Sequence, residues 1–180
     1  MSGVKKLIIT EDRNVFFLLN EKIKCKTLDR IMPKITHIGG PYFTILSCLL
    51  LILVGKNSVK VSALEALTTL TSSHIFVQIL KRLCTRPRPY MVLPEANTFK
   101  YLLRDYSFPS GHATASFSLA VSFSFFFPGL AVFLITLAVL VSISRIYMGL
   151  HYPSDVLIGS TMGIVFSYIT HIYGLMLPIL

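Results

Sequence analysis

Apolar residues fill long stretches of the chain, and polar residues collect between them. Four stretches contain one Asp, Glu, Lys or Arg at most: 35–55, 61–80, 106–144 and 156–180. The third is 39 residues long and is broken at Pro128-Gly129, so we expect two helices there. A helix needs about 20 apolar residues to cross the hydrocarbon of a membrane. The pattern therefore predicts five transmembrane helices.

The first 34 residues have a different character. They contain eight basic and four acidic side chains, while Phe16, Leu19 and Ile23 recur at helical spacing. A helix that is apolar on one side and charged on the other lies on a membrane surface. We therefore expect an all-α protein with an interfacial segment at residues 1–34 and a transmembrane domain at residues 35–180.

Composition narrows the possible classes of protein. Hydrophobic residues make up 53% of the 180 residues and charged residues only 14%, whereas a soluble domain carries about 25% charged residues. The net charge is +9, but the basic residues lie in the interfacial segment and in the loops between spans. No aromatic platform for a nucleic-acid strand accompanies them. Anionic lipid headgroups are thus the expected partner, and nucleic acid is not.

Polar clusters occur at the ends of particular spans. The second span runs into residues 81–90, the third begins at 109–112, and 144–155 joins the fourth to the fifth. A chain that crosses the membrane back and forth brings these three clusters to one boundary. Each alone has an ordinary interpretation, such as interfacial anchoring or helix capping. Together they supply positive charge, backbone donors, two histidines and an acid, which is the composition of a phosphoryl-transfer pocket.

The spacing of these clusters resembles a known signature. It consists of three parts: Lys81-x6-Arg88-Pro89, Pro109-Ser110-Gly111-His112 and Ser144-Arg145-x5-His151-x3-Asp155. This resembles the tripartite motif of the type 2 phosphatidic acid phosphatase family, which is related to vanadium haloperoxidases and bacterial class A acid phosphatases. All three parts are present in the family's order. The resemblance implies a membrane-embedded lipid phosphatase that uses no cofactor.

The resemblance also implies a role for each residue. His151 would attack phosphorus to give a phosphohistidine, Asp155 would hold one nitrogen of its ring, and His112 would protonate the leaving group and then activate water. Five residues would bind the phosphoryl oxygens: Lys81, Arg88, Ser110, Gly111 and Arg145. Fixed cations would take the place of a metal ion, and no cluster of carboxylates suited to magnesium accompanies them.

The substrate is expected to be a lipid phosphate or diphosphate. Undecaprenyl diphosphate, phosphatidylglycerophosphate and phosphatidic acid are the candidates, and the loop at 91–108 with the groove between spans should select among them. Two alternatives remain open from the sequence. One is a vanadate-dependent haloperoxidase, and the other is a transporter or binder of lipid phosphates without catalysis. The sequence does not indicate an oligomeric state.

The distribution of charge bears on which face of the membrane carries the site. Fifteen of the 17 Lys and Arg residues fall on the catalytic side, and only Lys56 and Lys60 on the other. The positive-inside rule would place the site in the cytoplasm. At least three of the fifteen are needed for phosphate, however, and bacterial members of the resembled family act on the outer face. We therefore expect a cell-membrane protein with an extracytoplasmic active site.

Other polar residues within the spans have weaker assignments. Thr71, His74 and Gln78 share a helical stripe with Lys81 and should face the bundle or the mouth of the pocket. We expect His74 to form an interhelical hydrogen bond. Glu65 could pair with Lys60 or serve function. His37 and His171 remain unassigned.

Overall fold

The structure, a computed structural model, describes residues 3–99 and 103–176, and within these ranges the regular structure is entirely helical. The α-helices are α1 (Gly3–Phe17), α2 (Lys26–Ile35), α3 (Pro41–Val54), α4 (Ser58–Cys84), α5 (Pro89–Val92), α6 (Gly111–Phe126), α7 (Ala131–Tyr147) and α8 (Pro153–Met176). A π-helical turn (Leu18–Lys22) follows α1, and 3-10 turns (Thr36–Gly39 and Pro128–Leu130) precede α3 and α7. The all-α fold is confirmed.

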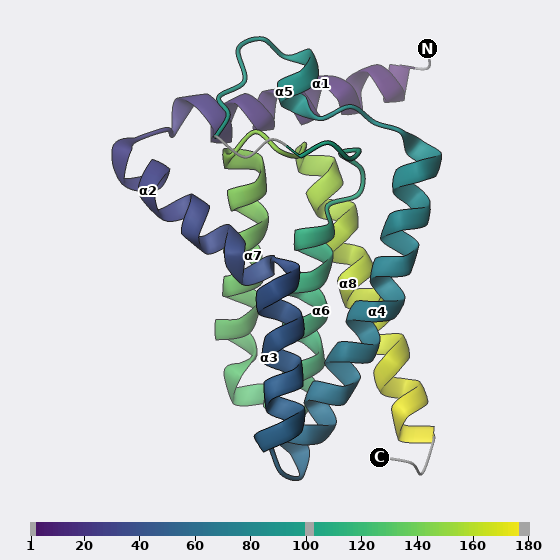
Figure 1. Ribbon diagram of the computed structural model, residues 1–180. Helices are drawn as coiled ribbons and strands as arrows, with labels where there is room; N and C mark the ends of the chain where they lie inside the picture. The colour runs from purple at the N-terminus through teal and green to yellow at the C-terminus, as the bar shows by residue number, and fades with distance from the viewer. Residues whose placement is uncertain (1–2, 100–102, 177–180) are drawn as a thin grey trace.

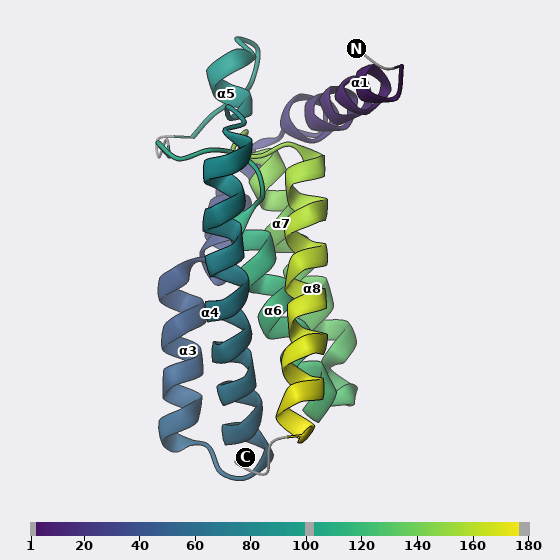
Figure 2. The same cartoon turned by 90° about the vertical axis from the view of Figure 1, so that its right-hand side faces the viewer.

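An elongated bundle is formed by α3, α4, α6, α7 and α8 (Figures 1 and 2). α6 lies at its centre and packs against α4, α7 and α8. The end of α4, the start of α6, the end of α7 and the start of α8 meet at one end of the bundle, where α1 lies across it and α5 projects beyond it. The three polar clusters therefore come together at one boundary, as predicted.

Small residues allow the central helices to approach closely. A Cβ on Gly159 of α8 would lie 2.6 Å from the backbone oxygen of Ser110, and one on Gly163 would lie 2.5 Å from that of Thr114. Farther along, the hydroxyl of Ser122 on α6 donates to Ser167 on α8 over 3.4 Å. Small side chains with hydroxyl contacts are typical of helix packing in membranes. This close contact holds the start of α6 against the start of α8.

The number of membrane spans stays a prediction. In the described ranges, two stretches are long and apolar enough to cross a membrane, Pro128–Tyr147 and Pro153–Gly174. A third is formed if Lys26–Gly39 and Pro41–Val54, which meet at a 49° bend, are taken together. The Gly39-Gly40-Pro41 sequence starts a new helix inside the predicted first span, so that α3 has only 14 residues. The predicted fifth span also extends to residues 177–180, which lie outside the described residues.

The N-terminal segment forms two helices, α1 and α2, which pack against the bundle. The side chain of Phe16 is completely buried and packs against Tyr152, with ring centroids 5.8 Å apart. Asp12 is also buried. α2 packs against α7. The apolar stripe identified in the sequence thus faces the bundle at Phe16, while Ile23 is exposed.

A buried polar pair lies far from the three polar clusters, toward the other end of the bundle. The buried Glu65 of α4 bonds Nδ1 of His171 on α8 at 2.9 Å, and the His171 ring stacks on Phe125 with centroids 4.2 Å apart. Pairing with Lys60 was one of the two alternatives that the sequence left open for Glu65, and the partner in the structure is His171. Because a buried acid needs a partner, the histidine that the sequence left unassigned supplies it and links α4 to α8.

Candidate active site

A cavity of about 770 Å³ opens at the end of the bundle where the three clusters meet. Its polar end is lined by Lys81, Arg88, Asp105, Gly111, His112, Arg145 and His151. Its other part lies between α3, α4 and α6 and is lined mainly by apolar side chains, among them Ile45, Leu67, Leu70, Ile75 and Ile79. A charged pocket thus continues into an apolar groove.

Two basic residues of the first cluster are held by an acid that the sequence did not single out. Nζ of Lys81 lies 2.8 Å from Oδ2 of Asp105, and Nη2 of Arg88 lies 2.8 Å from Oδ1. Burial raises the pKa of Asp105, but the hydrogen bond from Lys81 and the charge of Arg88 outweigh it and lower the pKa to about 2. The carboxylate therefore stays ionised and holds both cations at the cavity wall.

His151 lies in the turn between α7 and α8, and its ring is almost completely buried. Nδ1 is 2.8 Å from the backbone oxygen of Ser107, while Nε2 is 3.1 Å from Nη1 of Arg88. A carbonyl only accepts and a guanidinium only donates, so Nδ1 carries the proton, and Nε2 is unprotonated and accepts from Arg88. Burial and the charges of Arg88 and Arg145 lower the pKa of His151 well below its usual value. The ring is therefore neutral, and Nε2 is its unprotonated nitrogen.

Asp155 acts on His151 differently from the sequence-based expectation. Its Oδ2 is 3.8 Å from Nδ1 of His151, too far for a hydrogen bond. Oδ2 instead accepts from the hydroxyl of Ser107 at 2.5 Å and from the backbone N–H of Tyr152 at 2.9 Å. The backbone oxygen of Ser107, not the acid, holds the ring, and Asp155 holds Ser107. The predicted fold-back of Asp155 from the first turn of α8, which starts at Pro153, is confirmed.

The second cluster forms the start of α6. The fully buried Ser110 caps this helix, since its hydroxyl accepts from the N–H of Ala113 at 3.5 Å and its own N–H donates to the backbone oxygen of Asp155 at 3.0 Å. Gly111 and His112 follow directly and line the cavity. The helix N-terminus thus faces the polar end, where its free N–H groups suit an anion.

Arg145 is the most unusual cation of the site. It lies in the last turn of α7, is only 3% exposed, and donates from Nη1 to the hydroxyl of Thr36 at 2.9 Å. Its Nε and Nη2 find no hydrogen-bond partner within the described part of the chain. A buried guanidinium with two free donors beside a cavity is suited to bind an oxyanion.

The polar stripe of α4 also reaches the cavity. Thr71, His74 and Gln78 line it together with Lys81, as the sequence indicated. His74 was expected to form an interhelical hydrogen bond, which is wrong, because its Nε2 lies 3.0 Å from Nε2 of Gln78 on the same helix. Its ring also approaches the start of α6, where a Cβ on Gly111 would lie 3.7 Å from it.

Sequence reasoning missed four polar residues of the site: Asp12, Arg86, Asp105 and Ser107. Asp105 had a signal, since it is the only acid between Glu95 and Asp155. Arg86 lies two residues before Arg88 but is not a position of the three-part motif. The contribution of Ser107 is mainly a backbone oxygen, which residue type does not reveal.

The sequence model of the PAP2 superfamily matches residues 62–177, which contain all eight predicted site residues. The chain belongs to the PAP2 superfamily. An undecaprenyl-diphosphatase of Sulfolobus acidocaldarius is 29% identical over 87% of this chain and 75% of its own. A lipid A 1-phosphatase of Rhizobium etli is 33% identical over 58% of this chain and 47% of its own, so the chain spans about half the length of that relative.

The fold has a close structural counterpart. The crystal structure of LpxE from Aquifex aeolicus superimposes with a TM-score of 0.77 and 27% identity, over 89% of this chain and 94% of that one. The match extends over most of the helical bundle described above. The family suggested by the three spaced motifs is therefore confirmed, together with its helical architecture.

Proposed function

We propose that the protein is a membrane phosphatase that removes phosphate from a lipid phosphate or diphosphate through a phosphohistidine on His151. One observation carries the proposal. The neutral ring of His151 presents an unprotonated Nε2, which accepts from Arg88, at the polar end of a cavity whose remainder is apolar. Such a cavity suits a phosphate joined to a lipid tail.

The proposed reaction has two steps. Nε2 of His151 forms a bond to phosphorus while the bond to the leaving oxygen breaks, and His112 gives that oxygen a proton. Water then attacks the phosphohistidine with His112 as base, which releases inorganic phosphate and restores the ring. Lys81, Arg88 and Arg145 would neutralise the phosphoryl oxygens, which is the main catalytic requirement in phosphoryl transfer.

The relatives provide support for a lipid substrate without fixing which one. These relatives are a lipid A phosphatase and an undecaprenyl-diphosphatase, whose substrates share a phosphate joined to a large apolar part. The groove between α3 and α4 would hold the first portion of such a tail. The described part of the 91–108 loop contributes Leu103 and Asp105 to the cavity, while residues 100–102 lie outside the described residues.

The test is a phosphate-release assay on purified protein after exhaustive EDTA treatment. Liposomes would contain undecaprenyl diphosphate, phosphatidylglycerophosphate, phosphatidic acid or lipid A. We expect release from at least one of them without added metal, because three fixed cations surround the phosphate. Loss of all activity that only magnesium restores would contradict metal independence. Oxidation of bromide in the presence of vanadate, without phosphate release, would favour the haloperoxidase alternative.

We further propose that the site faces the outside of the cell. Four of the basic residues on its side of the membrane, Lys81, Arg86, Arg88 and Arg145, are held in the site by hydrogen bonds, so they serve the pocket and are a poor guide to orientation. At the opposite end of the bundle, the basic residues are Lys56, just before α4, and Lys60 in its first turn.

This orientation predicts the labelling of single cysteines. Thr98→Cys lies in the exposed loop at the site's end, and Ser58→Cys is exposed at the start of α4, at the other end. Each would be made in a protein whose three native cysteines are replaced. An impermeant thiol reagent on intact cells is expected to label the cysteine at 98 and to spare that at 58. The reverse pattern would place the site in the cytoplasm.

A further inference from the structure

The N-terminal helix α1 reaches the active site through one buried acid. Asp12 lies outside residues 62–177, the part that matches the family, and its side chain is 4% exposed. Its Oδ1 accepts from the backbone N–H of Ser154 at 2.8 Å, and its Oδ2 accepts from the Ser154 hydroxyl and from Nη2 of Arg86, both at 2.6 Å. Every one of these donors belongs to the first turn of α8 or to the segment just before Arg88.

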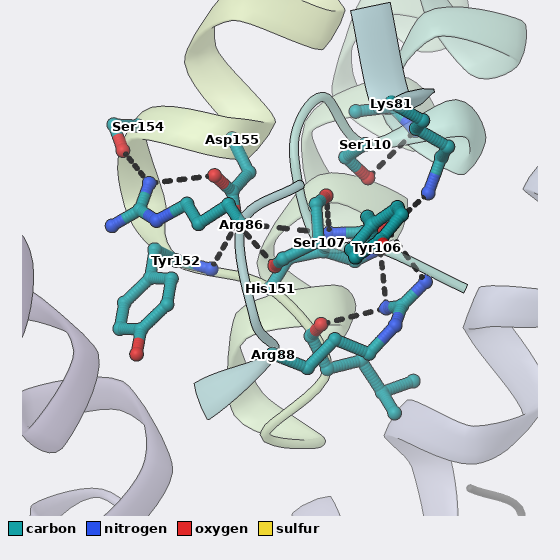
Figure 3. A network of polar contacts seen from close by, with 12 residues as sticks. Lys81, Arg86, Arg88, Tyr106, Ser107, Ser110, His151, Tyr152, Ser154 and Asp155 are labelled. Carbon is teal, nitrogen blue, oxygen red and sulfur yellow. Dashed lines mark hydrogen bonds and ion pairs between the residues drawn. The ribbon is translucent and has the colours of Figure 1, made fainter. Parts of the chain in front are cut away.

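Arg86 continues the connection from Asp12 to the catalytic acid. Its Nη1 donates to Oδ1 of Asp155 at 2.7 Å and to the hydroxyl of Ser154 at 2.8 Å (Figure 3). Its guanidinium also covers the ring of Tyr152, 3.9 Å from the centroid. The described basic residues that line the cavity are Lys81, Arg82, Arg88 and Arg145, and Arg86 is not among them. Arg86 therefore contacts Asp155 from outside the cavity in which the phosphate is proposed to bind.

The chain of contacts ends on the nucleophile. Asp155 accepts from Arg86 with one oxygen and from Ser107 with the other, and the backbone oxygen of Ser107 accepts from Nδ1 of His151. Each carboxylate oxygen of Asp155 has a donor, so its plane is fixed. The guanidinium of Arg86 is held between two carboxylates, because its Nη2 donates to Asp12 and its Nη1 donates to Asp155. Such supporting contacts set the precision of a catalytic group.

We infer that Asp12 is a positioning residue, which orients His151 through Arg86, Asp155 and Ser107, so that helix α1 forms part of the catalytic apparatus. The inference rests on the proposed function for its kinetic effect. It explains why a segment expected only to lie on the membrane surface has a buried acid and a buried Phe16 at the end of the bundle.

The test compares Asp12→Asn with Glu11→Gln, an exposed neighbour on the same helix. Asparagine keeps an oxygen for the N–H of Ser154 but loses the ion pair with Arg86, so the start of α8 stays capped. We expect Asp12→Asn to lower kcat about 10- to 100-fold with KM changed less than about 2-fold, because the nucleophile is misoriented while the phosphate cradle is intact. Glu11→Gln should match the wild type.

A double variant distinguishes positioning from general damage. If Asp12 acts through Arg86, Asp12→Asn should add less than about 2-fold to the loss caused by Arg86→Gln, since residues that act as a unit are not additive. Wild-type kcat in Asp12→Asn, a loss confined to KM, or two losses that multiply would each overturn the inference.

Binding of two oxyanions provides a readout that needs no turnover. Orthovanadate binds tightly because its vanadium accepts an electron pair from the histidine nitrogen. Inorganic phosphate forms no such bond and is held by the cationic side chains alone. Calorimetry should find the affinity of Asp12→Asn for orthovanadate weakened about 10-fold and that for phosphate within about 2-fold. Equal effects on both anions, or none, would overturn the inference. A wild-type protein that releases no phosphate from any lipid would refute the proposed function alone. The binding of the two anions to wild type and Asp12→Asn would still test the role of Asp12, because it requires no turnover.

Discussion

Replacement of His151 by alanine is expected to abolish phosphate release while the protein remains folded and inserted. The proposed mechanism has no other route to a covalent intermediate, since Nε2 of His151 is the atom that attacks phosphorus. Loss of a nucleophile of this kind lowers kcat on the order of 10⁴- to 10⁶-fold. Phosphate release would be measured on the best substrate of the liposome panel.

The same variant has a limited structural cost. Alanine leaves the backbone oxygen of Ser107 without its donor from Nδ1 and opens a small void, and an unmade buried hydrogen bond costs about 1–3 kcal/mol. Four helices still pack around the site, so the fold should survive. Size-exclusion chromatography in detergent would check this. Glu11→Gln, which changes an exposed side chain of α1, is the control and should retain activity.

A trapping experiment separates a nucleophile from a binding residue. The wild type is mixed with substrate labelled in its phosphate and is then quenched rapidly in base. Base is used because a phosphohistidine is acid-labile. The label should remain on wild-type protein and be absent from His151→Ala. Normal phosphate release by His151→Ala, or labelled protein in that variant, would remove His151 from its proposed role.

The sequence predicted the framework of this site well because the framework is local. The turn before α6 follows from the Pro109-Ser110-Gly111-His112 run, and Pro153 sets the start of α8, so that His151 falls in a turn. The convergence of three clusters follows from the alternation of apolar spans. These features depend on residue type and spacing alone, and the structure reproduces them.

The contacts that hold the catalytic groups depended on packing and could not be read in the same way. Ring orientation at His151 is set by a backbone oxygen, which every residue has. Asp12 is 143 positions from Asp155 in the chain, and its neighbour Glu11 looks equivalent in sequence but is exposed. Glu65 finds His171 instead of Lys60 because α4 and α8 pack together toward the far end of the bundle. Only the tertiary arrangement selects between such partners.

Replacement of Arg145 by glutamine is expected to remove most of the activity and to leave the empty protein as stable as the wild type or more so. Two of its guanidinium nitrogens have no hydrogen-bond partner in the described residues although the side chain is buried. A buried charge whose donors are unpaired is costly, which points to a group that is retained for a ligand. The phosphoryl oxygens would supply the missing acceptors.

The two effects of Arg145→Gln have opposite signs. Removal of one donor to the transition state should lower kcat/KM about 10²- to 10³-fold. Relief of unpaired buried donors is worth about 1–3 kcal/mol, and each kcal/mol raises Tm by about 2–4 °C for a chain of this size. Phosphate release and thermal unfolding in detergent would be measured on the same preparations, with Lys34→Gln, an exposed charge at the same end of the bundle, as control.

Ligand-induced stabilisation decides whether Arg145 binds the phosphate or only shapes the fold. Inorganic phosphate should raise the Tm of the wild type and of Lys34→Gln, because a ligand that binds only the folded state stabilises it, and it should raise the Tm of Arg145→Gln much less. A phosphate-dependent rise of wild-type size in Arg145→Gln would show that the cavity does not use this cation. A lower Tm for the empty variant, with activity retained, would make Arg145 a structural residue joined to Thr36 and would leave Lys81 and Arg88 to hold the phosphate.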